Sequence, residues 1–337
     1  MTIKRVGFAC KFMHNDRTLK PKMLKEIEGP LNYPGTTIRW MREHQDEAQE
    51  RVYDIVQHNL NATERLIDYV STLPLSQRML RIGSDMLPAY TEATFGHLTK
   101  TNYITDMIAG RLSSIGDKAR ANNVRMSMHP GQFCVLASDN PDIVQRSVEE
   151  FEYHADIARY MGYGKQFQDF KINVHISGRQ GPAGIKAILP QLSQEARNCI
   201  TIENDENKWG ISDSLELAND VALVLDIHHH WCREGEYIEV YDDRVKRVID
   251  SWRGVRPAMH YSCSREDYLV AHKPNVRPDL QQLIETGHKK GKLRAHSDYM
   301  WNSAVNEWAG SFRDEFDIMV EAKAKNLASI PFEEATR

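Results

Sequence analysis

Cysteine is scarce in this 337-residue sequence, and the few thiols are not spaced to act together. No Cys-x-x-Cys motif occurs, and the total of five is odd. These features argue against a disulfide framework and against a cysteine-based zinc site. We therefore expect the thiols to be buried or incidental side chains. The five are Cys10, Cys134, Cys199, Cys232 and Cys263.

Long hydrophobic runs are also missing. No apolar stretch approaches the ~20 residues that span a bilayer, and the one within residues 1–12 is too short for a signal peptide. With 41% hydrophobic residues, the chain can nevertheless bury a large core. We expect a cytoplasmic protein without a membrane segment, associated with the nucleoid if the source is prokaryotic.

An excess of basic residues, typical of proteins that contact many phosphates, is absent, because the formal net charge is −4. This average hides a local concentration: residues 264–296 contain seven Lys or Arg against four Asp or Glu. An acidic metal-binding core would also lower the total. The net charge therefore does not exclude a nucleic-acid partner.

Short apolar runs recur along the chain, each followed by a segment with helical periodicity, such as 142–160. The expected strands are Arg5–Cys10, Met79–Ile82, Val124–His129, Phe170–His175, Cys199–Glu203, Ala222–Asp226, Pro257–His260 and Phe316–Glu321. This alternation predicts βαβ units and a parallel sheet. Without a composition break, it favours an α/β fold in which residues 1–337 form a single (β/α)8 TIM barrel. A doubly wound open sheet is the alternative.

Two connections are too long for a minimal barrel. Residues 11–50 form a long connection after the first expected strand. Residues 262–310 form another, between the seventh and eighth expected strands. Connections beyond ~15 residues are usually functional or disordered. Both should emerge at the carboxyl face, where the active sites of such barrels lie.

Six successive expected strands end in an imidazole or a carboxylate, and such ends converge on one mouth in a parallel barrel. The six are His129, His175, Glu203, Asp226, His260 and Glu321. His229, three residues after Asp226, and His296, in the long seventh connection, are further candidates. Mixed ligands of this kind suit Mn²⁺, Zn²⁺ or Fe²⁺, and eight exceed the needs of one ion. The pattern predicts a cluster of two or three divalent ions.

A metal cluster of this composition favours phosphodiester hydrolysis. Ions ~3.5–4 Å apart ionise bound water near neutral pH and stabilise both oxygens of an in-line displacement at phosphorus. We expect four of the side chains to be essential for catalysis: Glu203, His175, Asp226 and Glu321. Directly after His129-Pro130-Gly131, Gln132 and Phe133 should project from the mouth, where they could enter a duplex at unstacked bases.

Several motifs, which follow one another along the chain in the family's order, resemble those of the UV damage endonucleases. They are HPGQF at 129–133, NVHISG at 173–178, IENDE at 202–206, LDIHHH at 225–230, HYSCSRE at 260–266, AHSDY at 295–299 and MVEAKAK at 319–325. The resemblance covers roughly residues 5–328. It implies a barrel related to AP endonucleases and xylose isomerases, with up to three ions and manganese favoured. It also implies incision of duplex DNA immediately 5′ of a UV photoproduct, leaving a 3′-hydroxyl, without ATP or another nucleotide cofactor. We expect a monomer.

The resemblance also implies residue roles. Carried over by position, the metal ligands are His129, His175, Glu203, Asp226, His229, His260, His296 and Glu321. The lesion probe falls on Gln132 and Phe133, where the family usually has Tyr at the second place. A phenyl ring keeps the stacking face, so lesion sensing should be retained.

Some positions depart from the family pattern. Ala258 stands where members tend to carry a lysine two residues before the histidine corresponding to His260, so a metal-bridging lysine is impossible there. A further family histidine, after the second strand, has no clean match: His97 is a candidate, and Glu92 lies nearer in spacing. Lys323 could face the site, and His230 could orient a ligand. The basic stretch 264–296 looks expanded and is expected to follow the DNA backbone.

Two other functions remain open. A sugar isomerase or epimerase of the same barrel group would use one or two ions and would not need Gln132 or Phe133. A non-catalytic protein that binds damaged DNA would leave the backbone intact with any metal. Nicking of irradiated plasmid distinguishes both from an endonuclease.

Overall fold

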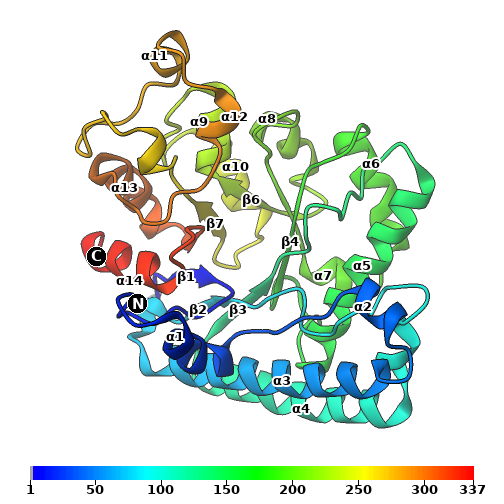
Figure 1. The fold of residues 1–337 in the computed structure, drawn as a ribbon. Coiled ribbons are helices and arrows are strands. Elements are labelled where there is room, and N and C mark those ends of the chain that lie inside the picture. The colour runs from blue at the N-terminus through cyan, green and yellow to red at the C-terminus, as the bar shows by residue number, and fades with distance from the viewer. Residues whose placement is uncertain (1–2) are drawn as a thin grey trace.

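The strands close into a barrel. The computed structural model describes residues 3–337, in which eight parallel strands pair in chain order and β8 pairs with β1 (Figure 1). They are β1 (Val6–Ala9), β2 (Met79–Arg81), β3 (Arg125–Met128), β4 (Lys171–His175), β5 (Ile200–Glu203), β6 (Ala222–Asp226), β7 (Ala258–Tyr261) and β8 (Asp317–Val320). Each lies within two residues of its expected bounds. The TIM barrel is confirmed, and the open sheet was wrong because the last strand hydrogen-bonds to the first.

Helices follow the strands around the outside of the barrel (Figure 1). They are α3 (Ala48–Thr72), α4 (Asn102–Ala121), α5 (Pro141–Tyr160), α6 (Gly181–Ile188), α7 (Gln194–Cys199), α8 (Ile211–Ser214), α9 (Ile227–Glu234), α10 (Asp243–Ser251), α13 (Ser303–Gly310) and α14 (Asn326–Ala335). Helix α5 shows why the segment is helical. Pro141 occupies its first turn, and the Asn140 side chain accepts a hydrogen bond from the Asp142 amide at 2.9 Å. Its apolar face is buried, as the periodicity of 142–160 predicted.

The two long connections contain helices of their own. The first includes α1 (Pro21–Glu28) and α2 (Ile38–Glu43), and the second includes α11 (Leu280–Glu285) and α12 (Lys290–Leu293) before α13. Residues 264–296, here called the extension, project beyond the barrel rim at α11 (Figure 1). A small buried cluster attaches the extension to α9 and consists of Trp231, Cys232, Leu269, Leu280, Leu283 and Leu293.

The amino end of the barrel is closed by one carboxylate and three arginines. Asp317 is fully buried at the start of β8. Its oxygens lie 2.7 Å from Nε of Arg256, 2.8 Å from Nη1 of Arg125 and 3.7 Å from Nη1 of Arg5. The arginines come from the amino ends of three strands. A single buried charge therefore ties β1, β3, β7 and β8 together at the end opposite the mouth.

The thiols behave as expected. All five are free, and four of them are buried, with Cys10 half-buried. No helix within residues 3–337 combines the length and the apolar character needed to cross a lipid bilayer.

A buried histidine in α5 should make stability depend on pH. His154 has no exposed surface, its Nδ1 lies 2.7 Å from the Glu150 carbonyl, and its Nε2 has no partner among residues 3–337. Burial lowers the pKa of His154 to about 4. The unfolded chain, with a histidine pKa near ~6.5, therefore binds a proton that the folded chain excludes. Between these values, stability is lost as pH falls.

We predict that His154→Gln removes this dependence. Between pH 7 and pH 5, the wild type should lose about 2 kcal/mol more free energy of unfolding than the variant. Urea denaturation of both proteins at the two pH values measures the difference, since other histidines contribute equally to both. Parallel pH profiles would show that His154 is not held neutral.

Candidate metal centre

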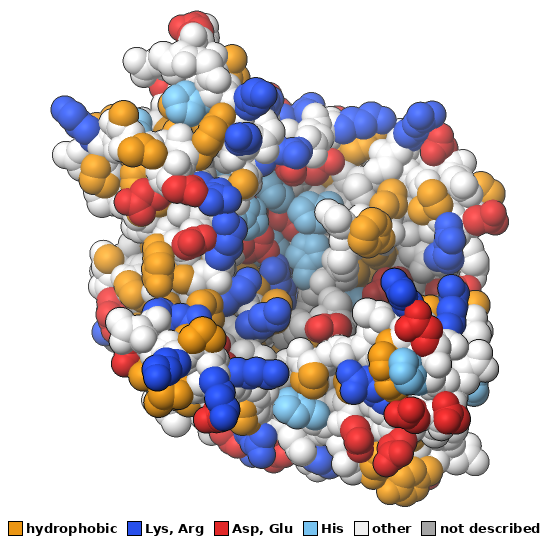
Figure 2. All heavy atoms as spheres, viewed as in Figure 1, with side chains coloured by type: hydrophobic (Ala, Val, Ile, Leu, Met, Phe, Trp, Pro, Cys, Tyr) orange, Lys and Arg blue, Asp and Glu red, His pale blue; other side chains and the backbone are white. Residues whose placement is uncertain are grey.

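The strand ends converge as the sequence predicted. His175 on β4 lies directly opposite Glu203 on β5, and Asp226 on β6 lies opposite His260 on β7. His129 directly follows β3, and Glu321 directly follows β8. In the space-filling view the mouth is a hollow with histidines and acidic side chains inside and basic side chains around the rim (Figure 2).

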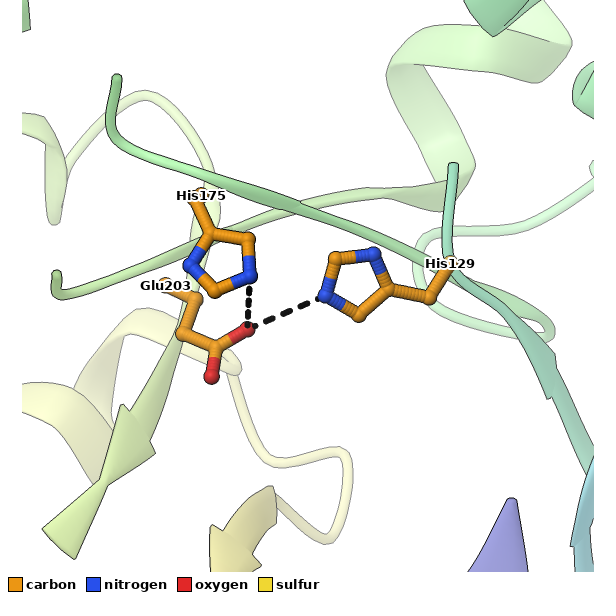
Figure 3. A group of neighbouring side chains, drawn as sticks. All are labelled: His129, His175 and Glu203. Carbon is orange, nitrogen blue, oxygen red and sulfur yellow. Dashed lines mark ion pairs between the residues drawn. The ribbon is translucent and has the colours of Figure 1, made fainter. Parts of the chain in front are cut away.

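Glu203 is the hub of the cluster and has no exposed surface. Its Oε2 lies 3.4 Å from Nε2 of His129 and 3.9 Å from Nε2 of His175, and both rings point toward it (Figure 3). Its Oε1 lies 3.0 Å from Nδ1 of His260 and 3.6 Å from Nδ1 of His229. One carboxylate thus faces four imidazoles that come from four different strands or their following turns.

Asp226 positions the candidate ligand His229, three residues later in the chain. Its Oδ1 caps α9 by accepting a hydrogen bond from the His229 amide at 2.8 Å, so the histidine ring returns to the mouth. Its Oδ2 lies 3.7 Å from Nε2 of His229. That oxygen is buried and has no hydrogen-bond partner among the described residues. A buried carboxylate oxygen without a hydrogen-bond partner is suited to bind a cation.

The last two candidates complete the ring of contacts. Glu321 follows β8, where its amide donates to the Tyr261 carbonyl at 2.8 Å, and its Oε1 lies 3.3 Å from Nδ1 of His260. His296 is held against β7 by an antiparallel bridge to Ser264, and its Nδ1 lies 3.9 Å from Oε2 of Glu321. All eight predicted ligands are therefore connected through one another at the mouth.

Charge and burial set the protonation of the cluster. Burial alone would raise the pKa of Glu203, but His260 and His175 hold that pKa well below its ordinary range. Burial raises the pKa of Asp226 well above its ordinary value. Burial opposes the protonation of His229, yet Asp226 and Glu203 beside it raise its pKa to about 9. A cation that enters the cluster must displace these protons.

The donor set fits divalent metal ions. Ligand atoms of His129, His175 and Glu203 lie within 4.8 Å of one another, and so do those of Glu203, Asp226 and His260. Glu203 belongs to both groups, so its two oxygens could serve two ions. Imidazole and carboxylate donors suit Mn²⁺, Zn²⁺ and Fe²⁺. The arrangement is that of a candidate metal centre in which Glu203 belongs to both groups of ligand atoms.

Two cationic side chains at the site were not predicted. Arg81, on β2, forms an ion pair with Glu321 inside the barrel. Lys171 is buried on β4, and its Nζ lies 2.8 Å from Nε2 of His260. Burial lowers the pKa of Lys171 to about 7. The period of two along a strand could have found Lys171, which lies four residues before His175 on the same face.

Lys171 contacts His260 although position 258, two residues before that histidine, is an alanine. Ala258 is fully buried inside the barrel, in a cluster that also contains Met79, Trp252 and Met319. No lysine lies on β7, but the one from β4 contacts the ring of His260 from beneath the cluster. The nitrogen of His260 that faces away from Glu203 is thus contacted by an amine of a different strand.

Three secondary candidates lie apart from this cluster. His97 is exposed, and its Nδ1 lies 2.9 Å from the Thr94 carbonyl in its own turn. Lys323 is exposed, 3.3 Å from Asp298. His230 is buried, but its Nε2 lies 3.2 Å from Glu236. Their expected roles stay predictions, since no described contact joins them to the eight ligands.

The loop after His129 separates two pockets. Phe133 is 85% exposed at its tip. A pocket of about 220 Å³ lies on the metal-centre side, lined by Gln132 and His175 among others. A second pocket of about 610 Å³ lies on the other side, lined by Phe133 and Arg146 among others. Gln132 lines both pockets, whereas the exposed ring of Phe133 lines only the larger one.

A TIM barrel whose mouth joins eight histidines and carboxylates defines the class: a barrel protein with a candidate metal centre at the carboxyl ends of its strands. The sequence narrows this class. Residues 4–334 match the family model described as UV-endonuclease UvdE, and the chain belongs to that family.

Curated relatives agree with this assignment, and solved structures share the fold. The chain is 25% identical over 299 residues to a UV DNA damage endonuclease of Bacillus cereus, covering 85% of this chain and 83% of the relative. It is 24% identical to a UV-damage endonuclease of Neurospora crassa, covering 85% of this chain and 49% of that protein. The fold is similar to the crystal structure of SacUVDE, with a TM-score of 0.71, 22% identity and coverage of 98% and 96%. It is also similar to endonuclease IV from Thermus thermophilus, with a TM-score of 0.51, 11% identity and coverage of 81% and 93%.

Proposed function

We propose that this protein is a metal-dependent DNA-repair endonuclease. It hydrolyses the phosphodiester immediately 5′ of UV photoproducts in duplex DNA, leaves a 3′-hydroxyl, and uses no ATP. We further propose that it acts as a monomer in the cytoplasm, with two or three ions of which Mn²⁺ is favoured. The observation that carries the proposal is the contact of one buried carboxylate, Glu203, with four imidazoles at the mouth.

The chain's own residues would hold and orient the reacting groups. When bound, divalent ions supply an ionised water and neutralise charge on the phosphate oxygens. His129, His175 and Glu203 would hold metal on the β3–β4 side of the centre. Asp226, already fixed by its cap on α9, would present its free Oδ2 to the other side. Arg81 would keep Glu321 ionised and in place.

Gln132 and Phe133 would recognise the lesion by entering the duplex. A photoproduct weakens base pairing, so the damaged nucleotides leave the stack at lower cost than intact ones. Phe133 is free to take their place in the stack because its ring packs against little protein. The pocket between Gln132 and His175 lies on the metal-centre side of the loop and would receive displaced bases.

The extension would follow the DNA backbone. Lys289, Lys290 and Lys292 are exposed on or beside α12. Arg294 joins the extension to the centre, because its Nη1 lies 3.0 Å from Glu206, whose other oxygen lies 3.8 Å from His229. Exposed lysines held beside a phosphodiesterase centre are suited to backbone phosphates, which supply affinity but no sequence information.

We predict that Phe133→Ala lowers discrimination between damaged and intact duplex by about tenfold, since aromatic stacking contributes about 1–3 kcal/mol per base. Metal binding should not change, because Phe133 lies outside the ligand cluster. Gel-shift titration with irradiated and untreated oligonucleotides measures the ratio of the two affinities. The exposed Tyr241→Ala provides a matched control. Equal discrimination in wild type and Phe133→Ala would remove Phe133 as the probe.

The overall proposal is tested with purified protein and supercoiled plasmid, UV-irradiated or untreated, with Mn²⁺ or with chelator. Nicking of the irradiated plasmid alone, and only with metal, is expected. End-labelled fragments with a defined photoproduct then locate the cut and its 3′ end. Binding without nicking under any metal would favour a non-catalytic damage-binding protein. Turnover of an aldose or ketose in place of nicking would favour a sugar isomerase.

A further inference from the structure

Two lysines adopt strained backbone conformations where the barrel closes. Lys11 follows β1 with φ 73°, and Lys325 follows β8 with φ 54° and ψ −121°. Strands β1 and β8 are hydrogen-bonded neighbours, so both lysines leave the carboxyl face at the same side of the mouth. Side-chain-bearing residues rarely occupy such conformations, and in native proteins they cluster at functional sites.

The strain at Lys11 is held in place by two asparagines. The Phe12 amide donates to Oδ1 of Asn32 at 2.7 Å, and Nδ2 of Asn32 donates to the Phe12 carbonyl at 2.9 Å. The Met13 amide donates to Oδ1 of Asn326 at 2.8 Å, and Nδ2 of Asn326 donates to the Met13 carbonyl at 2.9 Å. Asn326 directly follows Lys325. The same residue therefore fixes the two strained turns relative to each other.

The two ammonium groups have no anion of their own. Within residues 3–337, no carboxylate lies within 4.0 Å of either Lys11 or Lys325. The nearest acid of the cluster, Glu321, is paired with Arg81. Burial lowers the pKa of Lys325, and the positive charges of Arg81 and Lys11 lower it further, although Cys10 and Glu321 oppose this. Lys11 and Lys325 are therefore two amine side chains without a carboxylate partner among the described residues, beside the β8 end of the metal centre.

We propose that Lys11 and Lys325 form a binding site for a backbone phosphate of the DNA strand that is cut. The inference rests on the proposed function, since the site borders the metal centre at Glu321. Lysines bind phosphate as point charges, and rigid turns fix the backbone from which the two side chains extend, so the backbone need not be ordered at the moment of binding. The loop with Phe133 follows β3, two strands away around the barrel, so the phosphate site and the lesion probe contact the duplex at separate points.

The test uses glycine, which tolerates both conformations. Lys325→Gly should raise the melting temperature, because the strain is released, while it raises the Kd for duplex DNA about tenfold. It should also reduce the slope of log Kd against log salt by about one, and Lys11→Gly by about one more. Lys325→Gln should weaken binding equally without the gain in melting temperature. Asn123→Gly, also at positive φ but before β3 at the amino end, is the matched control and should leave binding and nicking unchanged.

Binding is measured with an undamaged duplex oligonucleotide in chelator, so that it does not depend on cutting. Unchanged Kd and salt slope in both lysine variants would overturn the phosphate site. A fall in the melting temperature of Lys325→Gly would also overturn it, because the lysine would then be structural. If the wild type binds with a lysine-dependent salt slope but never nicks irradiated plasmid, the phosphate site stands and the proposed endonuclease activity fails.

Discussion

Replacing Glu203 by glutamine is expected to reduce incision of irradiated plasmid on the order of 10³-fold or more, the scale of loss when a group central to catalysis is removed. The amide keeps the shape of the side chain, so it still fits between His129 and His260. It loses the negative charge with which the carboxylate would bind a metal ion. Apo-protein titrated with Mn²⁺ should also bind fewer ions. Plasmid nicking and calorimetric metal titration measure the two effects.

Glu333→Gln is the matched control for this experiment. Glu333 is equally buried but lies in α14, where it pairs with Arg313 and Arg337. Its loss should lower the free energy of unfolding and leave metal binding and nicking intact. Glu203→Gln should show the opposite pattern, with activity lost and the fold retained. Normal nicking by Glu203→Gln, or loss of nicking in both variants, would contradict the assignment of the centre.

The largest loss of stability is expected from replacing Asp317, at the amino end of the barrel. Asp317→Asn leaves Arg5, Arg125 and Arg256 facing one another without a carboxylate. Breaking a buried ion pair by removing one partner costs about 3–5 kcal/mol. We expect about 3 kcal/mol here, because the arginine side chains keep partial access to water. Guanidinium denaturation measures the change.

Asp314→Asn is the control for Asp317→Asn. Asp314 is exposed and pairs with Lys4 at the surface, so little change in stability is expected. Residual nicking per folded molecule should be normal in both variants, since the arginine cluster lies at the amino end of the strands. A small loss of stability in Asp317→Asn would mean that water and backbone carbonyls already satisfy the three guanidinium groups.

The barrel and the convergence of the candidate ligands at its mouth could be predicted because they depend on local patterns. Apolar runs with helical segments between them fix parallel strands, and the closure of the barrel then brings the strand ends together. His129 and Glu321 lie 192 positions apart by their residue numbers, yet both follow from the same rule. The rule is that the carboxyl ends of parallel barrel strands meet at one mouth, and it can be applied without knowing any side-chain conformation.

Lys171 and Arg81 could not be assigned in the same way. Both lie inside the barrel, where the pattern of a strand tells which face a residue occupies but not which partner its long side chain reaches. Lys171 crosses the interior from β4 to β7 to contact His260. The strained backbone at Lys325 could not be predicted from the sequence either. It depends on the hydrogen bonds of Asn326 to a loop more than 300 residues away. Long-range geometry, rather than local propensity, determines these features.

The position of β8 near the end of this chain has a consequence for synthesis. Until residues 317–320 leave the ribosome, β1 and β7 remain open edges, and Glu321, which contacts His260, is not yet present. A chain interrupted before this point has neither a closed barrel nor the carboxylate of Glu321 beside His260. Closure of the barrel and assembly of the candidate metal centre therefore depend on the same strand.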